Sequence, residues 1–178
     1  MRILFLTPFL PDQGAHHGGG SSGPHRGAKF SLLEGGIRVP AIISWPGNLP
    51  ENAVRGQLAT SCDWLPTIAA LCEVDLPKHA LDGKDITSVI KSDSAKTPHA
   101  TFFWESLGQW AVRQGDWKLI HNAKDTSTGN RVNAKGGLQL FNIAKDPGEA
   151  KNLAKAEPDV TARLKALRDS WNKTKAVQ

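Results

Sequence analysis

The stretch QWAVRQGDWKLIH, residues 109–121, decides the fold of the second half of the chain. Its two runs of apolar and aromatic residues flank Gly115-Asp116, and a short Gly-containing connection between such runs is typical of a β-hairpin. Similar short runs occur before this stretch in ATFFWES, residues 100–106, and after it in LQLFNI, residues 138–143. The sequence therefore predicts a small antiparallel sheet built from these runs.

A helix is predicted to follow this sheet and to end the chain. From about Glu157 onward, apolar residues step by four, three and four positions, at Val160, Leu164, Leu167 and Trp171. This spacing places them on one face of an amphipathic helix. Successive strands followed by one helix favour a helix packed on the sheet. We therefore expect residues 96–178 to form a C-terminal antiparallel sheet plus terminal helix.

The first half of the chain, residues 1–95, has a different pattern. RILFLT, residues 2–7, and VPAIISWPG, residues 39–47, are typical of buried strands. The Gly-, Pro- and His-rich residues 8–27 between them lack periodicity and predict a long loop. A helix is predicted after Asp63, with Pro66 in its first turn. We expect a partial α/β core here, with the polar residues 91–99 as the linker.

The composition and charge of the chain argue against some classes of partner. The chain has 178 residues, 39% of them hydrophobic, and a formal charge of +5 from scattered Lys and Arg, so we expect no nucleic-acid partner. No apolar run approaches the roughly 20 residues of a membrane-spanning helix, so we expect no membrane partner. Cys62 and Cys72 have no metal-binding spacing, and we expect them to be small core residues.

Five motifs follow one another along the chain, namely GPHRGAKFSLLEGGIRVPAIISWPG, SCDWLPTIAALCEV, LDGKDI, WAVRQGDWKLI and LQLFNIAKDPGEAKNLA. In this order they resemble segments of the arylsulfatase family, the formylglycine-dependent sulfatases, and the resemblance covers about residues 23–170. It implies an α/β fold, the C-terminal portion of the alkaline-phosphatase-like sulfatase fold, ending in a small antiparallel sheet packed by a C-terminal helix. It also implies a sulfuric ester hydrolase whose partner is a sulfated carbohydrate or an aryl sulfate ester.

The resemblance gives roles to three residues of the segment before the second strand. Lys29 matches the lysine of the family that contacts sulfate, and it is the predicted catalytic residue. Cleavage of a sulfate ester requires fixed cations that neutralise charge on the sulfate oxygens. Arg26 and His25 are further candidates for substrate binding. Glu34, Gly35, Gly36 and Arg38 are interpreted as scaffold, with Glu34 and Arg38 holding each other or nearby amides.

The resemblance implies a calcium site and a nucleophile that this chain matches incompletely. Asp12 and Gln13 stand where the family has Asp-Asn, and their oxygens suit calcium. The family nucleophile is a formylglycine made within Cys/Ser-x-Pro-x-Arg, and neither cysteine begins that motif. We expect the nucleophile and the early Asp-Asp pair to belong to a missing N-terminal sulfatase portion, and this chain alone to be inactive.

Two alternatives stay open. The chain is a non-catalytic remnant that binds sulfate or sugar, or it is a fusion whose first 20 residues come from a glycosyltransferase, since MRILFLTPFLPDQGAHHGGG resembles the opening of a GT-B enzyme. A Cys/Ser-x-Pro-x-Arg motif encoded in frame upstream of Met1 would favour a sulfatase. The sequence does not predict a cellular location.

Overall fold

A computed structural model describes residues 2–5, 21–127, 132–133 and 136–175. By their contacts, these residues group into two compact units. One holds Ile42–Ala100 and most of the first strand, and the other holds residues 21–41 and 101–175. The predicted division into domains of residues 1–95 and 96–178 stays a prediction. None of the described helices is long and apolar enough to cross a membrane.

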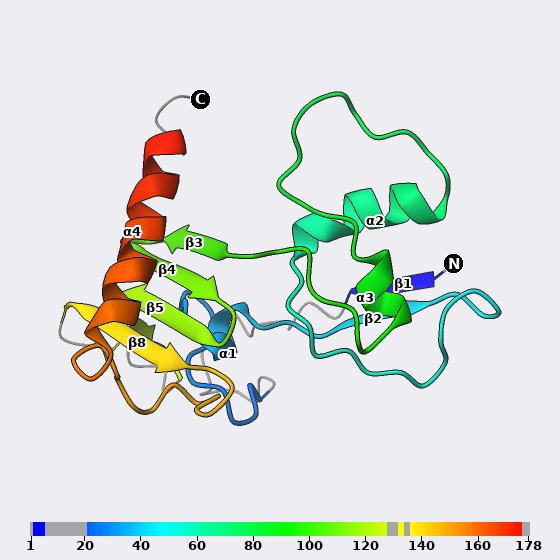
Figure 1. The fold of residues 1–178 in the computed structure, drawn as a ribbon. Helices are drawn as coiled ribbons and strands as arrows, with labels where there is room; N and C mark the ends of the chain where they lie inside the picture. The colour runs from blue at the N-terminus through cyan, green and yellow to red at the C-terminus, as the bar shows by residue number, and fades with distance from the viewer. Residues whose placement is uncertain (1, 6–20, 128–131, 134–135, 176–178) are drawn as a thin grey trace. The chain divides into compact units, whose positions relative to one another are not determined.

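The second unit is built on a four-stranded antiparallel sheet (Figure 1). Its strand order is β3 (Phe102–Ser106), β4 (Gln109–Gln114), β5 (Trp117–His121) and β8 (Leu138–Asn142). The predicted hairpin is confirmed, because Gln114 pairs with Trp117 across Gly115-Asp116 and Gly115 has φ +58°. Two short strands, β6 (Lys124–Asp125) and β7 (Val132–Asn133), form a separate antiparallel pair.

The terminal helix α4 (Pro158–Lys175) covers one face of this sheet (Figure 1). Leu164, which is fully buried, packs with Val112, Leu119 and Leu140, one residue from each of three strands. Val160 and Leu167 lie against the same cluster, and the Trp171 ring stacks on Phe103 with ring centroids 4.9 Å apart. The predicted packing of the helix on the sheet is confirmed.

The opposite face of the sheet is covered by the segment around helix α1 (Glu34–Ile37), which the sequence did not predict to be a helix. Leu32 and Leu33 from this segment pack into a core with Ala111, Ile120 and Phe141. Strand residues alternate between the two faces, so neighbours in β4 and β5 belong to different cores. The sheet is therefore the middle layer of three.

A buried group of charges joins that segment to the sheet. The Nζ of Lys118 lies 2.8 Å from Oε1 of Glu34 and 3.0 Å from Oε1 of Glu149, and all three side chains are at most 3% exposed. The backbone N–H of Glu34 donates to Oε2 of Glu149 at 2.6 Å. Nη1 of Arg113 is 3.4 Å from Oε2 of Glu34, and Nη1 of Arg38 is 3.9 Å from it. The predicted Glu34–Arg38 contact is therefore the outer edge of a larger network.

The two carboxylates respond differently to this setting. Burial raises the pKa of Glu34, but Lys118, Arg113 and Arg38 together outweigh it and hold that pKa below its usual range. Burial also raises the pKa of Glu149, and there Lys118 and the Glu34 amide offset only part of the effect. Lys118 is thus the charge that lets both carboxylates lie in the interior.

The first unit contains β1 (Arg2–Phe5), β2 (Ala41–Ser44), the 3₁₀ turn η2 (Ser61–Asp63), α2 (Trp64–Leu71) and α3 (Thr87–Lys91). Strand β1 pairs with β2, and the helix predicted after Asp63 is confirmed. The carboxylate of Asp63 is fully buried. It accepts the N–H groups of Thr60 and Lys84 at 2.7 and 2.8 Å and lies 2.7 Å from Nε2 of His99.

Two predictions of burial in this unit, for the strand with Ile42 and for the two cysteines, are wrong. Ile42 in β2 is 48% exposed, because β1 is its partner strand among the described residues and no third layer covers it there. Both cysteines are exposed. In α2 the buried residues are Pro66, Thr67 and Ala69, and Leu65 is 53% exposed. The polar contacts of Asp63 and Thr67, rather than apolar spacing, set which face of α2 is buried.

Replacing Lys118 with Met should destabilise the chain by about 3–5 kcal/mol at neutral pH, because two buried carboxylates lose their counter-charge. Without Lys118, the folded-state pKa of Glu149 rises further above its unfolded value, and that of Glu34 rises too, although Arg113 and Arg38 still face it. Groups with raised pKa values stabilise the fold when protonated. The deficit should therefore be full at neutral pH and shrink as the pH falls through those raised values. Urea unfolding across pH measures it.

The matched control is Lys165→Met. Lys165 pairs with Asp169 at 2.7 Å on the exposed face of α4, and surface pairs contribute about 0–1 kcal/mol. A Lys118→Met variant that unfolds at the same urea concentration as Lys165→Met would contradict the role given to the buried network.

Candidate functional site

Lys29 lies in a tight turn formed by residues Ala28 to Ser31. The N–H of Ser31 donates to the carbonyl of Ala28 at 3.0 Å, which closes the turn. Phe30, in the third position, has φ +71°, a region that favours glycine or asparagine. A bulky residue in that conformation is an outlier that its surroundings must hold in place.

The turn is fixed to the polar end of β6 on both sides of Lys29. The N–H groups of Gly27 and Ala28 donate to Oγ of Ser127 at 2.6 Å and to Oγ1 of Thr126 at 2.9 Å. After the turn, Oγ of Ser31 donates to the carbonyl of Lys124 at 2.6 Å. These contacts fix the backbone on both sides of Lys29.

A buried glutamine supports the turn from the sheet. Nε2 of Gln109, at the start of β4, donates to the carbonyl of Phe30 at 2.8 Å. Its Oε1 accepts the N–H of Lys124 at 3.0 Å and that of Leu32 at 3.4 Å. Gln109 is fully buried, so its amide joins β4, β6 and the turn in a setting where an unmade hydrogen bond is costly.

The side chains at the tip of the turn reach solvent. Lys29 is partly exposed, and its ammonium lies 5.2 Å from the centre of the Phe30 ring, a cation–π distance. Phe30 is 49% exposed. The backbone that carries Lys29 is held by several hydrogen bonds and the residue is partly exposed, an arrangement suited to presenting a cation to an anion.

Arg26 and His25, the other predicted substrate contacts, lie on the same segment and also contact the protein. Nε of Arg26 is 2.9 Å from Oδ2 of Asp125, and its Nη1 donates to the carbonyl of Glu149 at 2.6 Å. Nδ1 of His25 lies 3.0 Å from the carbonyl of Pro147. These contacts fasten the segment to the turn after β8. The substrate-binding role of Arg26 and His25 stays a prediction.

Asp125 links these contacts to the base of the Lys29 turn. Its Oδ1 accepts the Oγ–H and the N–H of Ser127 at 2.7 and 3.0 Å. Partial burial raises the pKa of Asp125, but the Ser127 donors and Arg26 outweigh it and hold the pKa below its usual range. No periodic pattern marks Asp125, Thr126 or Ser127, because they lie in a polar stretch that is typical of a loop.

The predicted calcium ligands, Asp12 and Gln13, lie outside the described residues, as do Met1 and residues 6–20 of the glycosyltransferase-like opening. Across residues 2–5, 21–127, 132–133 and 136–175, no group of three or more His, Cys, Asp or Glu is placed to hold a metal ion. The calcium site stays a prediction.

The pattern Ser-x-Pro-x-Arg does occur once, at Ser22-Gly23-Pro24-His25-Arg26. The expectation that this chain lacks the motif is therefore wrong for the serine form of the pattern. Ser22 lies in the segment that carries Lys29, and its Oγ donates weakly to the carbonyls of Gly27 and Gly35 at 3.4 and 3.5 Å. Arg26 of the pattern is held by Asp125. These contacts are those of a scaffold, and the absence of a nucleophile stays a proposal.

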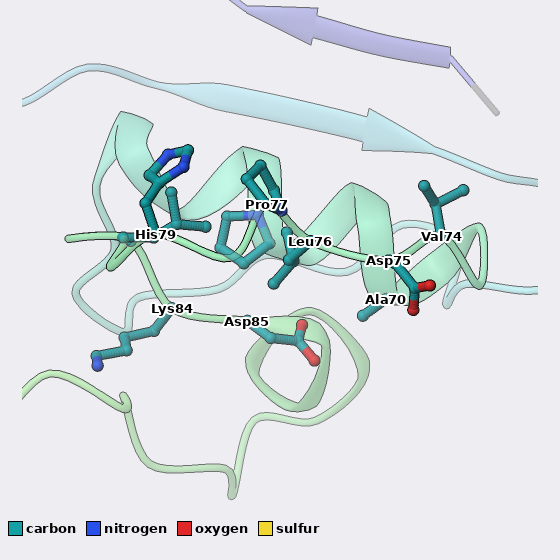
Figure 2. A pocket seen from close by; sticks show the side chains of 11 residues that line it. Ala70, Val74, Asp75, Leu76, Pro77, His79, Lys84 and Asp85 are labelled. Atoms are coloured by element: carbon teal, nitrogen blue, oxygen red, sulfur yellow. The ribbon is translucent and has the colours of Figure 1, made fainter.

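An open pocket lies in the first unit, beside α2 (Figure 2). Figure 2 shows Leu76, Pro77 and His79 from the segment after α2, and Lys84 and Asp85 from the segment before α3. None of the predicted site residues lines it. We therefore take the Lys29 turn as the candidate site.

Residues 28–176 match the family model described as N-sulphoglucosamine sulphohydrolase, C-terminal. Among curated proteins, arylsulfatase A of Homo sapiens is 34% identical over 93% of this chain and 36% of its own length. The chain spans about a third of the length of the curated relatives it matches. The matched residues include the Lys29 turn, the buried charge network and α4.

Two solved structures share the fold. One, from work on the metabolism of multiple glycosaminoglycans by Bacteroides thetaiotaomicron, is 28% identical with a TM-score of 0.67 and covers 85% of this chain and 32% of its own. Another, in complex with its substrate D-glucosamine-2-N,6-O-disulfate, is 18% identical with a TM-score of 0.56 and covers 76% and 28%. The second likeness, at that identity, concerns the fold alone.

Gly35→Ala should loosen the segment that carries Lys29. A Cβ at Gly35 would lie 2.2 Å from the carbonyl oxygen of Gly27, and that backbone has little room to move because Ser127 and Thr126 hold it. We expect a loss of about 1–3 kcal/mol of unfolding free energy. Urea unfolding followed by tryptophan fluorescence measures it.

Gly56→Ala is the control, since no heavy atom lies within 4 Å of a Cβ built there. It should be neutral or stabilise by up to about 1 kcal/mol. Equal effects of the two substitutions would mean that the close approach at Gly35 does not fix the segment.

Proposed function

Because the chain belongs to the sulfatases, through the family described as N-sulphoglucosamine sulphohydrolase, C-terminal, we propose that it forms the C-terminal part of a sulfuric ester hydrolase and carries one of its sulfate-binding groups. The family and the fold class expected from the sequence are confirmed. The three-layer unit of segment, sheet and helix is the part of that fold on which Lys29 is mounted.

The proposal rests on the hydrogen bonds that hold the backbone turn carrying Lys29. Its turn is held by Ser127 and Thr126 on one side and by Gln109 beneath, and Lys29 itself is partly exposed. Hydrolysis of a sulfate ester breaks the S–O bond, and negative charge is shared between the sulfate oxygens and the departing alkoxide. A cation fixed in advance stabilises this charge better than a mobile one, because no ordering is needed during the reaction.

The proposed substrate is a sulfated carbohydrate. The structure from work on Bacteroides thetaiotaomicron, 28% identical to this chain, concerns the metabolism of glycosaminoglycans. An aryl sulfate is the alternative, suggested by the likeness to arylsulfatase A. Both present the same tetrahedral monoanion to Lys29, so the role of the lysine does not depend on this choice.

We further propose that this chain alone does not hydrolyse sulfate esters. Neither cysteine begins the nucleophile motif, and Ser22, which does, is engaged with backbone carbonyls of its own segment. The nucleophile and the remaining metal ligands are expected on the sulfatase portion that precedes this one in the relatives.

Lys29→Gln should weaken binding of inorganic sulfate to the chain by about tenfold, because the glutamine keeps a polar side chain but removes the charge that neutralises the anion. Chemical-shift titration with sodium sulfate, at constant ionic strength set with chloride, measures it. Lys155→Gln, which removes an exposed lysine ahead of α4, is the matched control and should leave sulfate binding unchanged. If both variants bind sulfate equally well, Lys29 does not have the proposed role.

The purified chain should release no alcohol from 4-nitrophenyl sulfate, with or without added calcium. Absorbance of the phenolate follows the reaction. Turnover that survives purification and is abolished in Ser22→Ala would overturn the proposed inactivity and identify Ser22 as the nucleophile. Turnover that Ser22→Ala retains would overturn it as well and place the nucleophile elsewhere in the chain.

A further inference from the structure

Glu149 is the less well compensated of the two carboxylates in the buried charge group. Glu34 accepts a hydrogen bond from Nζ of Lys118 at 2.8 Å. Its other oxygen also lies 3.4 Å from Arg113 and 3.9 Å from Arg38. Among the described residues, Glu149 is paired with the Lys118 ammonium alone, 3.0 Å from its Oε1, and this contact lacks hydrogen-bond geometry. Two buried carboxylates thus share one fully buried ammonium, and Glu149 has the smaller share.

The residues around Glu149 fasten the segment that begins at His25. Oε2 of Glu149 accepts the N–H of Glu34 at 2.6 Å, and its carbonyl accepts Nη1 of Arg26 at 2.6 Å. Two positions earlier, the carbonyl of Pro147 lies 3.0 Å from Nδ1 of His25. Glu149 has φ +52°, a costly conformation for a residue with a side chain, which its surroundings must hold in place. The loop after β8 therefore acts as a clip on this segment.

A proton on Oε1 of Glu149 would remove the charge imbalance. Oε2 already accepts the Glu34 N–H, so Oε1 is the oxygen at which the proton is expected. Glu34 and Lys118 then form a neutral pair. Burial raises the pKa of Glu149 and the Glu34 carboxylate adds to this effect, while Lys118 and the Glu34 N–H offset only part of it.

Other charged groups surround the clip, residues 147–149, and its partners. Among the described residues they are His25, Arg26, Glu34, Arg38, Arg113, Lys118, Asp125 and Asp146. The pKa values of Glu34 and Asp125 are held below their usual range, so these two carboxylates stay ionised while Glu149 takes up its proton.

The sign of the pH effect follows from linkage. Opening of residues 25–38 would admit water to Glu149 and return its pKa to the usual value. The closed state therefore binds the proton more tightly than the open state, and the proton favours the closed state in turn. The segment should be held more firmly as the pH falls from neutral toward about 4.3, the usual pKa of a glutamate. At lower pH, protonation of Glu34 and Asp125 removes stability instead.

We propose that Glu149 is a proton-controlled clip, in which mildly acidic solution places a proton on its Oε1 and fastens residues 25–38 more firmly to the sheet. The clip acts on the backbone that carries the candidate site, and it acts whether or not a sulfate ester is bound there. It gives this chain a preference for mildly acidic surroundings.

Hydrogen exchange of the full chain between pH 5 and 7.5, corrected for the intrinsic exchange rate at each pH, tests the clip. The N–H of Gly35, which donates to the Arg26 carbonyl at 2.8 Å, should become about three- to tenfold more protected as the pH falls. In Glu149→Gln, which cannot ionise, this protection should not change with pH. His25→Gln is the matched control, because it removes a histidine that contacts the clip, and it should keep the wild-type pH dependence.

A second measurement needs no variant. Carbon-13 titration of the Glu149 side-chain carboxyl in the wild type should give a midpoint above about 4.3, and the Glu34 amide proton shift should follow the same midpoint. A midpoint below that value overturns the inference, even where Glu149→Gln does not fold. So does a pH dependence that Glu149→Gln retains or that His25→Gln abolishes. No sulfate is present, so these results do not depend on the proposed function.

Discussion

The packing of the second unit depends on the burial of one ammonium group, that of Lys118. A buried charge is tolerated when opposite charges meet it, and here these come from two segments far apart in the chain, Glu34 before the sheet and Glu149 after it. Because Glu34 and Glu149 both pair with Lys118, their two segments lie on the same face of the sheet. The Lys29 turn lies in the first segment and is tied by Arg26 to the second. The position of the candidate site thus follows from the charge balance beneath it.

Much of this unit was predictable because its elements have strong periodic patterns. The hairpin at Gly115-Asp116 and the face of α4 with Val160, Leu164 and Leu167 follow from turn chemistry and from spacing. The scaffold role of Glu34 was also inferred, but its main partner was not. Lys118 and Glu149 stand in two motifs of the resemblance, yet pairing between motifs cannot be read from a single sequence. Nor could the sequence show that the second face of the sheet is covered by Leu32 and Leu33.

Polar contacts determine burial in parts of this chain. In α2, Asp63 and Thr67 hold the inner side through hydrogen bonds, while Leu65 is 53% exposed. At the candidate site, the residues that position Lys29 include Ser127 and Thr126, in a stretch without apolar periodicity. Hydrophobic patterns reveal cores well. They give little information on the polar residues that hold a turn in place.

The separation in sequence between the partners at the Lys29 turn has a consequence for the order of events during synthesis. Gly27 is bound by a residue 100 positions later, and Arg26 by one 123 positions later. Contacts that distant form slowly, because the chain between them must be ordered first. The ribosome synthesises Lys29 early, whereas Gln109, Ser127 and Glu149, which hold its segment, are synthesised much later. Until then Leu32 and Leu33 have no sheet to cover, so this apolar part of the nascent segment stays exposed beside Lys29.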